Sequence, residues 1–158
     1  LGDRGGILRD GRFQQIGRLV DLLRRPANEF VARFMRCKNI LTGEALGAGP
    51  GETTKIAVGA NELFVPGMHQ GHVTFTLRPE NIRLMPAGSV SAGAADCRIS
   101  VHRVRSIDLG AYVRVDLDGA LPLVAHLSRS DFSELPPDSQ TPLLALIRPD
   151  AIHVLPAA

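Results

Sequence analysis

Aromatic residues are scarce in this chain, which has one Tyr, six Phe and no Trp in 158 residues. Proteins that bind single-stranded nucleic acid stack bases on aromatic side chains, and surfaces that follow a phosphate backbone need clustered basic residues. Here the formal net charge is only +2, and the charges are spread along the chain. We therefore expect no nucleic-acid partner. Hydrophobic residues at 44% and charged residues at 22% are typical of a globular protein with a real core.

Cysteine and long apolar runs are scarce as well. Cys37 and Cys97 lie far apart without a CxxC pair, so we expect no disulfide framework and a reducing compartment. The apolar run 142–147 is far too short to cross a bilayer, and the amino end has no signal-peptide pattern. The start at Leu1 indicates a piece of a longer protein.

Patterns for catalysis or metal binding are also missing. His69 and His72 are close in sequence, but they lie in a Gly-punctuated stretch with no third ligand at a suitable spacing. The Gly-rich run 47–52 lacks the Lys-Ser/Thr ending of a phosphate-binding loop, and no GxSxG nucleophile turn occurs. We expect no catalytic residue, no metal ligand and no nucleotide site in this chain.

What the sequence does contain is an internal repeat. The residues LRPENIRL at 77–84 recur as IRPDAIHV at 147–154. In each copy an apolar strand runs into an Arg, a Pro ends the strand because it lacks an N–H, and the following acid is expected to cap one helical turn. A repeat at a fixed offset predicts two similar units that bury their apolar faces against each other. The alternative is a chance recurrence of a common strand-turn-strand pattern.

The first 37 residues differ from the rest in their pattern of apolar residues and turn signals. Asp10-Gly11 is a strong two-residue hairpin signal between the apolar-periodic runs 6–9 and 12–17. The apolar spacing then becomes helical at 19–23, where Pro26 ends the pattern, and again at 30–35. This predicts a β-hairpin and two short helices, too small to stand alone.

The remaining residues predict a mainly β fold, with tandem small OB-like barrels behind the hairpin and helices. Strict alternation from Ala111 to Leu117 and from Leu121 to Leu127 predicts strands with one buried face, and Pro122 fits an edge strand. A short helix is expected at 128–135. The expected organisation is 1–37 as a hairpin and helices, 38–86 as a first barrel unit, 87–96 as a linker and 97–158 as a second unit.

Several motifs resemble the closing stretch of ATP-binding subunits of ABC importers, at residues 3–4, 7–12, 15–17, 25–34 and 39–41. The resemblance covers the whole chain and implies that the barrels are the carboxy-terminal regulatory region called TOBE. It also implies a parent protein that binds ATP and Mg²⁺, whereas this chain would hold no cofactor and would not be an enzyme. One departure is Arg18-Leu19, where the family usually has Thr-Pro, so the next helix should lack its usual cap.

The second unit also resembles small molybdate-binding domains at the ends of molybdate and tungstate importer ATPases. Ser128 and Arg129 match the Thr and Arg of the family's Thr-Arg-x-Ser motif, and Arg148 stands where the family has Lys. The resemblance therefore implies an oxyanion site made by Ser128, Arg129, Ser130 and Arg148. Hydroxyls, N–H groups and cations suit a tetrahedral oxyanion.

Three departures count against a working oxyanion site. Asp131 replaces the final Ser of the motif, Asp150 stands where a small residue is usual, and the family's Ser-Ala-Arg-Asn stretch is absent. A carboxylate about 4 Å from a bound anion costs roughly 4 kcal/mol at an effective dielectric constant of about 20. In the alternative interpretation, Arg129 and Arg148 only line a barrel rim or pair with Asp131 and Asp150.

Two functions remain open at this point. In the first, the chain regulates and dimerises an importer ATPase and senses an oxyanion such as molybdate, tungstate or sulfate. In the second, it is a structural dimerisation spacer in an importer for iron, polyamine or sugar and binds no small ligand. Both imply a homodimer, membrane permease subunits as partners of the parent, and a cytoplasmic location on the inner face of the membrane.

Overall fold

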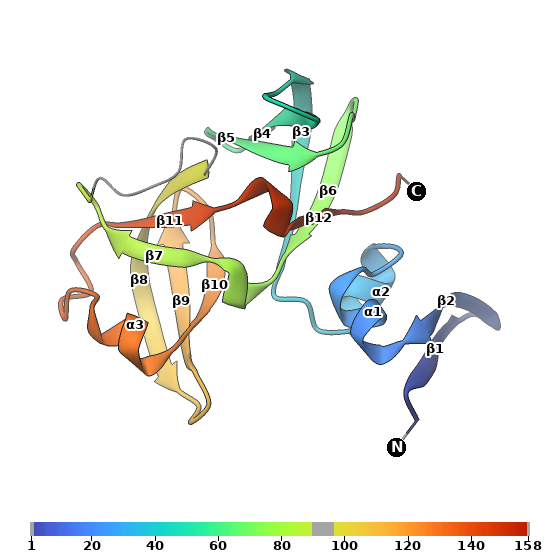
Figure 1. Ribbon diagram of the computed structural model, residues 1–158, viewed down its shortest axis with the longest axis horizontal. Coiled ribbons are helices and arrows are strands. Elements are labelled where there is room, and N and C mark those ends of the chain that lie inside the picture. The colour runs from blue at the N-terminus through green and yellow to red at the C-terminus, as the bar shows by residue number, and fades with distance from the viewer. Residues whose placement is uncertain (1, 90–96, 158) are drawn as a thin grey trace.

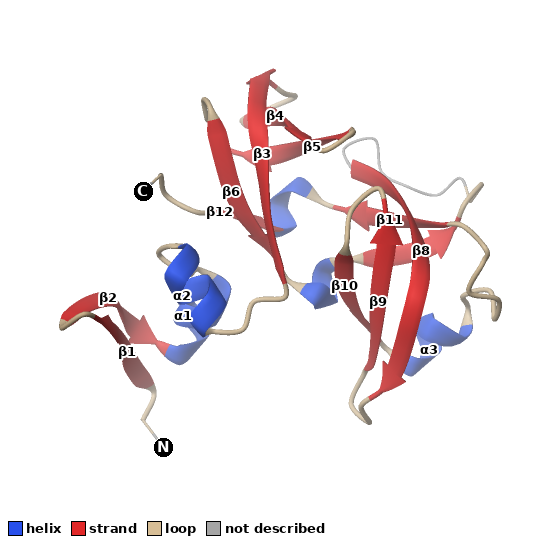
Figure 2. Ribbon diagram, turned by 180° about the vertical axis from the view of Figure 1, so that it is seen from behind, coloured by secondary structure: helices blue, strands red, loops and turns tan. Residues whose placement is uncertain are grey.

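The computed structural model describes residues 2–89 and 97–157. It contains an N-terminal segment and two five-stranded antiparallel sheets, which lie side by side in both views (Figures 1 and 2). Each sheet curls into a half-barrel. The expectation of a mainly β fold, with two OB-like units behind a hairpin and short helices, is confirmed.

The N-terminal segment is a hairpin followed by two helices, as predicted. Its elements are β1 (Arg4–Arg9), β2 (Arg12–Arg18), α1 (Leu19–Arg24) and α2 (Glu29–Phe34). At the turn Asp10 has φ 51° and Gly11 has φ 74°, the two positive values that a type I′ hairpin turn requires. Arg18 precedes α1 without a side-chain cap, as its replacement of the usual Thr predicts. Asn28 caps α2 by accepting from Val31 N at 2.9 Å.

The first sheet has the strand order β12-β6-β3-β4-β5 and the second has the order β10-β9-β8-β11-β7. The strands of the first sheet are β3 (Asn39–Ala48), β4 (Thr53–Val58), β5 (Asn61–Pro66), β6 (His72–Leu77) and β12 (Ile152–Val154). The strands of the second sheet are β7 (Arg83–Pro86), β8 (Cys97–Asp108), β9 (Val113–Gly119), β10 (Leu123–Leu127) and β11 (Leu143–Ile147). Pro122 directly precedes β10, an edge strand, as predicted.

The repeat explains how the sheets are joined. Each copy crosses from one sheet to the other: β6 lies in the first sheet but β7 pairs with β11 in the second, and β11 lies in the second but β12 pairs with β6 in the first. The crossings are the 3-10 turns η1 (Pro79–Asn81) and η2 (Pro149–Ala151). The units 38–86 and 97–158 thus exchange their last strands, a feature that their predicted boundaries do not contain. The division itself stays a prediction, and linker residues 90–96 lie outside the described residues.

The acid that follows each Pro forms an ion pair with the Arg before the turn. The N-cap residues Arg78 and Arg148 make no side-chain cap at η1 or η2, and capping by the acids stays a prediction. Glu80 accepts from Arg78, and Asp150 accepts from Arg148. These pairs are favourable because a carboxylate binds a cation more strongly than a neutral N–H.

One hydrophobic core serves both sheets. Ile56 and Phe75 of the first sheet belong to the same buried cluster as Val115 and Ile147 of the second, because alternate residues of every strand face inward. The N-terminal segment has a separate small core around Leu22. The two sheets therefore form one body, to which the N-terminal segment is attached.

Candidate functional site

Three of the four predicted oxyanion ligands lie at the start of α3 (Arg129–Ser133). Ser128 caps this helix, and its Oγ accepts from Asp131 N at 3.0 Å. Arg129 pairs with Asp108, with 3.3 Å between Nη2 and Oδ1. A hydrogen bond from Gly110 N, with help from Arg129, lowers the pKa of Asp108. The predicted pairing of Arg129 with Asp131 was wrong, because the Asp131 N–H turns back to Ser128 and Asp108 lies beside the guanidinium.

Ser130 and Arg148 complete the predicted set. The backbone O of Ser130 accepts from Ser133 Oγ at 2.7 Å, and within residues 2–89 and 97–157 the Ser130 side chain forms no hydrogen bond. Arg148 Nη2 lies 2.7 Å from Asp150 Oδ2, so the predicted pairing of these two residues is confirmed. Both side chains of this pair are about two-thirds exposed.

The structure does not bring Arg148 together with the other three residues. Arg148 follows Ile147, which pairs with Cys97 at the first residue of β8, whereas Arg129 pairs with Asp108 at the last residue of β8. β8 is 12 residues long, and at about 3.3 Å per residue this is roughly 36 Å of strand. Figure 1 shows α3 and the end of β11 well apart. One chain therefore does not assemble the predicted site.

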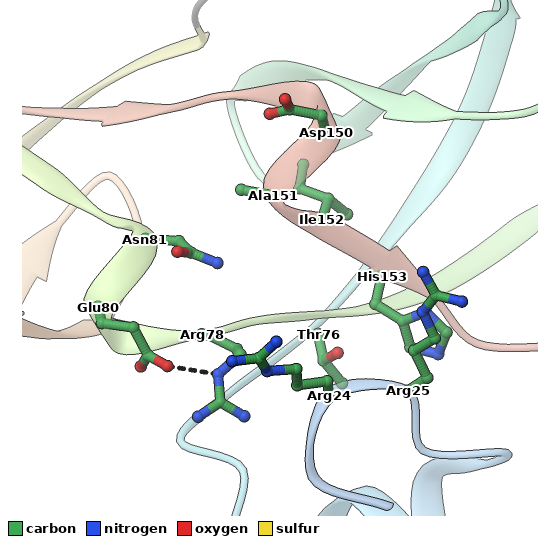
Figure 3. A pocket seen from close by; sticks show the side chains of 10 residues that line it. All are labelled: Arg24, Arg25, Thr76, Arg78, Glu80, Asn81, Asp150, Ala151, Ile152 and His153. Atoms are coloured by element: carbon green, nitrogen blue, oxygen red, sulfur yellow. Dashed lines mark hydrogen bonds and ion pairs between the residues drawn. The ribbon is translucent and has the colours of Figure 1, made fainter. Parts of the chain in front are cut away.

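A basic pocket lies elsewhere, between the N-terminal segment and the first sheet (Figure 3). Its volume is about 670 Å³. Figure 3 shows Arg24, the last residue of α1, pointing toward Arg78, and Arg25, the next residue, pointing toward His153, with Asp150 on the opposite side. The lining residues are Arg24, Arg25, Thr76, Arg78, Glu80, Asn81, Asp150, Ala151, Ile152 and His153.

Two hydrogen bonds from repeat residues hold the N-terminal segment against the first sheet beside this pocket. Arg78 Nη1 donates to Leu23 O at 3.2 Å, and His153 Nε2 donates to Pro26 O at 3.0 Å. Arg78 belongs to the first copy of the repeat and His153 to the second. The strand exchange is what places both copies at this joint, because it brings β12 next to β6.

The charges around the pocket are unevenly balanced. Burial acts to raise the pKa of Glu80, but the hydrogen bond from Arg78 outweighs it and the pKa is lowered, so Glu80 is a carboxylate that neutralises Arg78. Asp150 is neutralised by Arg148. Arg24 and Arg25 form no ion pair with any residue in the described ranges 2–89 and 97–157. The pocket wall that they form is therefore positive.

Sequence reasoning missed this pocket, although part of its signal was present. Arg78 stands at the same place in the first repeat as Arg148 does in the second, and Arg24-Arg25 is a dibasic pair just before Pro26. The repeat could have drawn attention to Arg78. Nothing in the sequence pattern places the dibasic pair beside it, because that contact depends on how the N-terminal segment docks.

The two histidines considered for metal binding point to different partners. His69 Nε2 donates to Pro66 O at 2.7 Å, while His72 Nδ1 lies 2.7 Å from Glu44 Oε2. Within residues 2–89 and 97–157 no group of three or more His, Cys, Asp or Glu side chains could hold a metal ion. In the same ranges no helix has the length and apolar character needed to span a membrane.

Comparison with known proteins identifies relatives of the whole chain, although no family model matches it. A molybdate/tungstate import ATP-binding protein of Pyrococcus horikoshii is 33% identical over 157 residues, which are 99% of this chain and 43% of that protein. An sn-glycerol-3-phosphate import ATP-binding protein of Brucella abortus is 23% identical over 128 residues, 81% of this chain and 34% of that protein. The chain thus spans about two fifths or less of the length of these relatives.

The fold also has a counterpart among solved structures. The cytoplasmic molybdate-binding protein ModG, in a form with molybdate bound, superposes with a TM-score of 0.60 at 14% sequence identity. The match covers 75% of this chain and 96% of ModG, and at this identity it concerns the fold alone. The sequence relatives show that the chain is homologous to the C-terminal region of the ATP-binding proteins of ABC importers, and the solved structure shows that its fold is ModG-like and TOBE-like.

Proposed function

We propose that this chain is the regulatory and dimerisation region of the ATP-binding subunit of an ABC importer for molybdate or tungstate. The observation that carries the proposal is the 33% identity to the Pyrococcus horikoshii protein, which extends over 99% of the chain. It includes the N-terminal segment as well as both sheets. The ModG-like fold supports the proposal, because that fold holds molybdate in ModG.

In this proposal, the nucleotide-binding and membrane-spanning parts of the importer would lie outside these 158 residues. ATP and Mg²⁺ would bind in a preceding nucleotide-binding domain, whose last part is the N-terminal segment. Permease subunits would hold the protein at the cytoplasmic face of the membrane. A second copy would pair with the barrels, since ABC importers couple two ATP-binding subunits and β7 is an edge strand of the second sheet.

In this function the barrels would sense the transported oxyanion. Ser128, Arg129 and Ser130 lie together, and Arg148 lies at the other end of β8. One anion would be held by both arginines only if two copies supply them, so sensing and dimerisation would be linked. An anion that binds one dimer arrangement more tightly shifts the population toward it, and this would lower transport when the oxyanion is plentiful inside the cell.

A structural spacer is the second candidate, and the ion pairs favour it. Arg129 and Arg148 each already pair with a carboxylate. An incoming anion must displace Asp108 or Asp150, or bind beside it, and repulsion weakens binding in either case. The relative from Brucella abortus carries the name of a different solute. In this reading the barrels hold two ATPase subunits in register and bind nothing small.

Calorimetric titration of the chain with molybdate, tungstate and sulfate separates the two candidates. Sensing predicts saturable binding of molybdate or tungstate that Arg129→Ala and Arg148→Ala each abolish. Arg98→Ala is the matched control, because Arg98 is exposed on β8 and its substitution removes the same charge. If none of the three anions gives a heat of binding, the sensing function is refuted and the structural spacer is the remaining candidate. Binding that survives both Arg129→Ala and Arg148→Ala would refute the predicted ligands.

A second measurement addresses the importer itself. The full-length subunit, assembled with its permease in liposomes, should take up molybdate more slowly when molybdate is also supplied on the ATP side. Deleting the barrels should remove this inhibition and leave basal uptake. Uptake that ignores molybdate on the ATP side would contradict a sensing role.

A further inference from the structure

The basic pocket at the joint differs from the predicted oxyanion site in position and in residues. None of Ser128, Arg129, Ser130 and Arg148 lines it. Its walls come from the N-terminal segment on one side and from both copies of the repeat on the other (Figure 3). A ligand held there would touch two parts of the molecule that have separate hydrophobic cores.

The backbone that carries the dibasic pair is held in place. Gln15 Nε2 donates to Arg25 O at 3.0 Å, and Gln15 Oε1 accepts from Ala27 N at 2.8 Å. Arg25 N in turn donates to Asp21 O at 2.8 Å. Arg24 and Arg25 therefore start from a fixed turn, which reduces the entropy lost when their side chains close on a ligand.

The chemistry of the wall fits an oxyanion group. Arginine presents a planar fork of donors that binds phosphate or carboxylate through two hydrogen bonds. Arg24 and Arg25 have no carboxylate partner in the described ranges, whereas Arg78 is already neutralised by Glu80. Thr76 and Asn81 add a hydroxyl and an amide to the lining. Two unpaired cations in a concave site are an arrangement that a bound anion stabilises.

The size of the pocket points to more than a single ion. A volume of about 670 Å³ lies within the range of about 300–1,000 Å³ that is typical of metabolite sites. We propose that this pocket binds a metabolite-sized anion with more than one phosphate-like oxyanion group, one held by Arg24 and another by Arg25. The site goes beyond the proposed function, because it does not depend on the solute that the importer carries.

The position of the site gives binding a consequence. The anion would lie beside the two hydrogen bonds that join the segments, from Arg78 to Leu23 and from His153 to Pro26. These bonds are few, and within residues 2–89 and 97–157 neither buried cluster includes residues from both sides of the joint. A ligand that contacts both sides would favour the docked arrangement of the N-terminal segment.

Titration with pyrophosphate and with inorganic phosphate tests the site, since the first probes a larger anion and the second a free oxyanion. We expect saturable binding of pyrophosphate, and roughly a hundredfold weaker binding in the Arg24→Ala/Arg25→Ala variant, because two charge-assisted contacts are lost. Arg24→Lys/Arg25→Lys keeps the charge but loses the forks, and should weaken binding about tenfold. Inorganic phosphate that binds as tightly as pyrophosphate would overturn the assignment of a metabolite-sized ligand.

The matched control is Arg12→Ala/Arg98→Ala, which removes the same two charges from exposed positions that do not line the pocket. Its affinity should equal that of the unmodified chain. Amide NMR shifts at Thr76 and His153 should follow the titration and locate the ligand. If both double variants bind pyrophosphate equally weakly, the weakening is due to net charge alone and the proposal is overturned. Absence of pyrophosphate binding at millimolar concentration would also overturn it.

The outcome is separable from that of the proposed function. Loss of molybdate binding in Arg129→Ala concerns the barrel rim, whereas loss of pyrophosphate binding in Arg24→Ala/Arg25→Ala concerns the joint. Each pair of residues is exposed, so all variants should fold. Thermal unfolding without ligand checks this, because a variant that binds weakly but melts with the unmodified chain has lost a contact and not its structure.

Discussion

The buried side chain of Asn39 ties the two sheets together, and its removal should destabilise the whole body. Asn39 is 2% exposed. Its Nδ2 donates to Leu77 O at 3.1 Å and to Val124 O at 2.9 Å, and its Oδ1 accepts from Val124 N at 2.8 Å. Leu77 lies in β6 of the first sheet and Val124 in β10 of the second. Asn39→Ala breaks all three bonds.

The expected loss follows from these bonds. A hydrogen bond contributes about 0.5–1.5 kcal/mol net, so three of them correspond to roughly 1.5–4.5 kcal/mol. Water can reach the half-buried Val124 and offset part of this, which leaves an expected loss of about 3 kcal/mol in the free energy of unfolding. For a chain of this size 1 kcal/mol shifts Tm by roughly 2–4 °C, so Tm should fall by about 6–12 °C.

Urea unfolding followed by circular dichroism measures this loss, and Asn61→Ala is the matched control. Asn61 also links the sheets, but through one bond of 3.5 Å from Nδ2 to Ala120 O. Because that bond is long and exposed, its removal should cost below about 1 kcal/mol. If Asn39→Ala is no more destabilising than Asn61→Ala, the two sheets are not held by this side chain.

The variant Asn39→Asp adds a test by pH. It keeps an acceptor for Val124 N but turns the other oxygen toward the carbonyl oxygens of Leu77 and Val124. Burial and repulsion favour the protonated form, so the pKa of this carboxyl should be raised in the folded state. The folded state then binds more protons than the unfolded state, and stability should fall as the pH rises from about 4 to about 7. A pH-independent difference from the unmodified chain would refute this reasoning.

Three further outcomes are expected. Burial acts to raise the pKa of Asp116, but hydrogen bonds from Arg105 and Arg114 outweigh it and the pKa is lowered. The stability that this carboxylate contributes is present above its unfolded-state pKa and is lost as the pH falls through its folded-state pKa. Urea unfolding should therefore show that Asp116→Asn destabilises the chain at neutral pH and much less in acid. Burial raises the pKa of the Cys37 thiol, so alkylation with iodoacetamide should be slow in the native chain and fast in denaturant. Ending the chain at Asp150 removes β12 and exposes the edge of β6, so gel filtration should show aggregation, and a monomeric product would contradict the role of β12.

Local structure could be predicted from the sequence where a few adjacent residues decide it. The turn at Asp10-Gly11 needs two positive φ values, which Gly adopts freely and Asp tolerates, and the structure has both. The strands on either side of Asp118-Gly119 follow from strict alternation, and every second residue there is buried. In these elements the information lies within about ten residues.

The arrangement of strands could not be predicted in the same way. β7 and β12 each complete a copy of the repeat, yet each pairs in the sheet of the other copy. Which sheet a short strand joins depends on tertiary packing and not on its own alternation. Asn39 shows the same limit, because its partner Val124 is 85 residues away. The sequence offers no local sign of that contact.

The predicted ligands show where a resemblance stops being informative. Ser128 and Arg129 are neighbours in sequence, so they lie together in any fold. Arg148 was added because it matched a family position, and the structure places it at the far end of β8. A shared motif preserves residue types, whereas the distance between motifs in one chain or across two chains depends on assembly.

The strand exchange gives the two sheets a direct connection to the N-terminal segment. The stretch 143–154 runs as β11 in the second sheet, turns at η2 and continues as β12 in the first, where His153 bonds to Pro26. A displacement of β11, which pairs with β7 and β8, would therefore reach the joint through the short turn η2 and β12, which pairs with β6. Coupling also requires an element with two arrangements, and we propose that the joint is this element, because two hydrogen bonds beside a charged pocket hold it. Regulation by the barrels would act through this joint, and an anion bound by Arg24 and Arg25 would set how firmly it is closed.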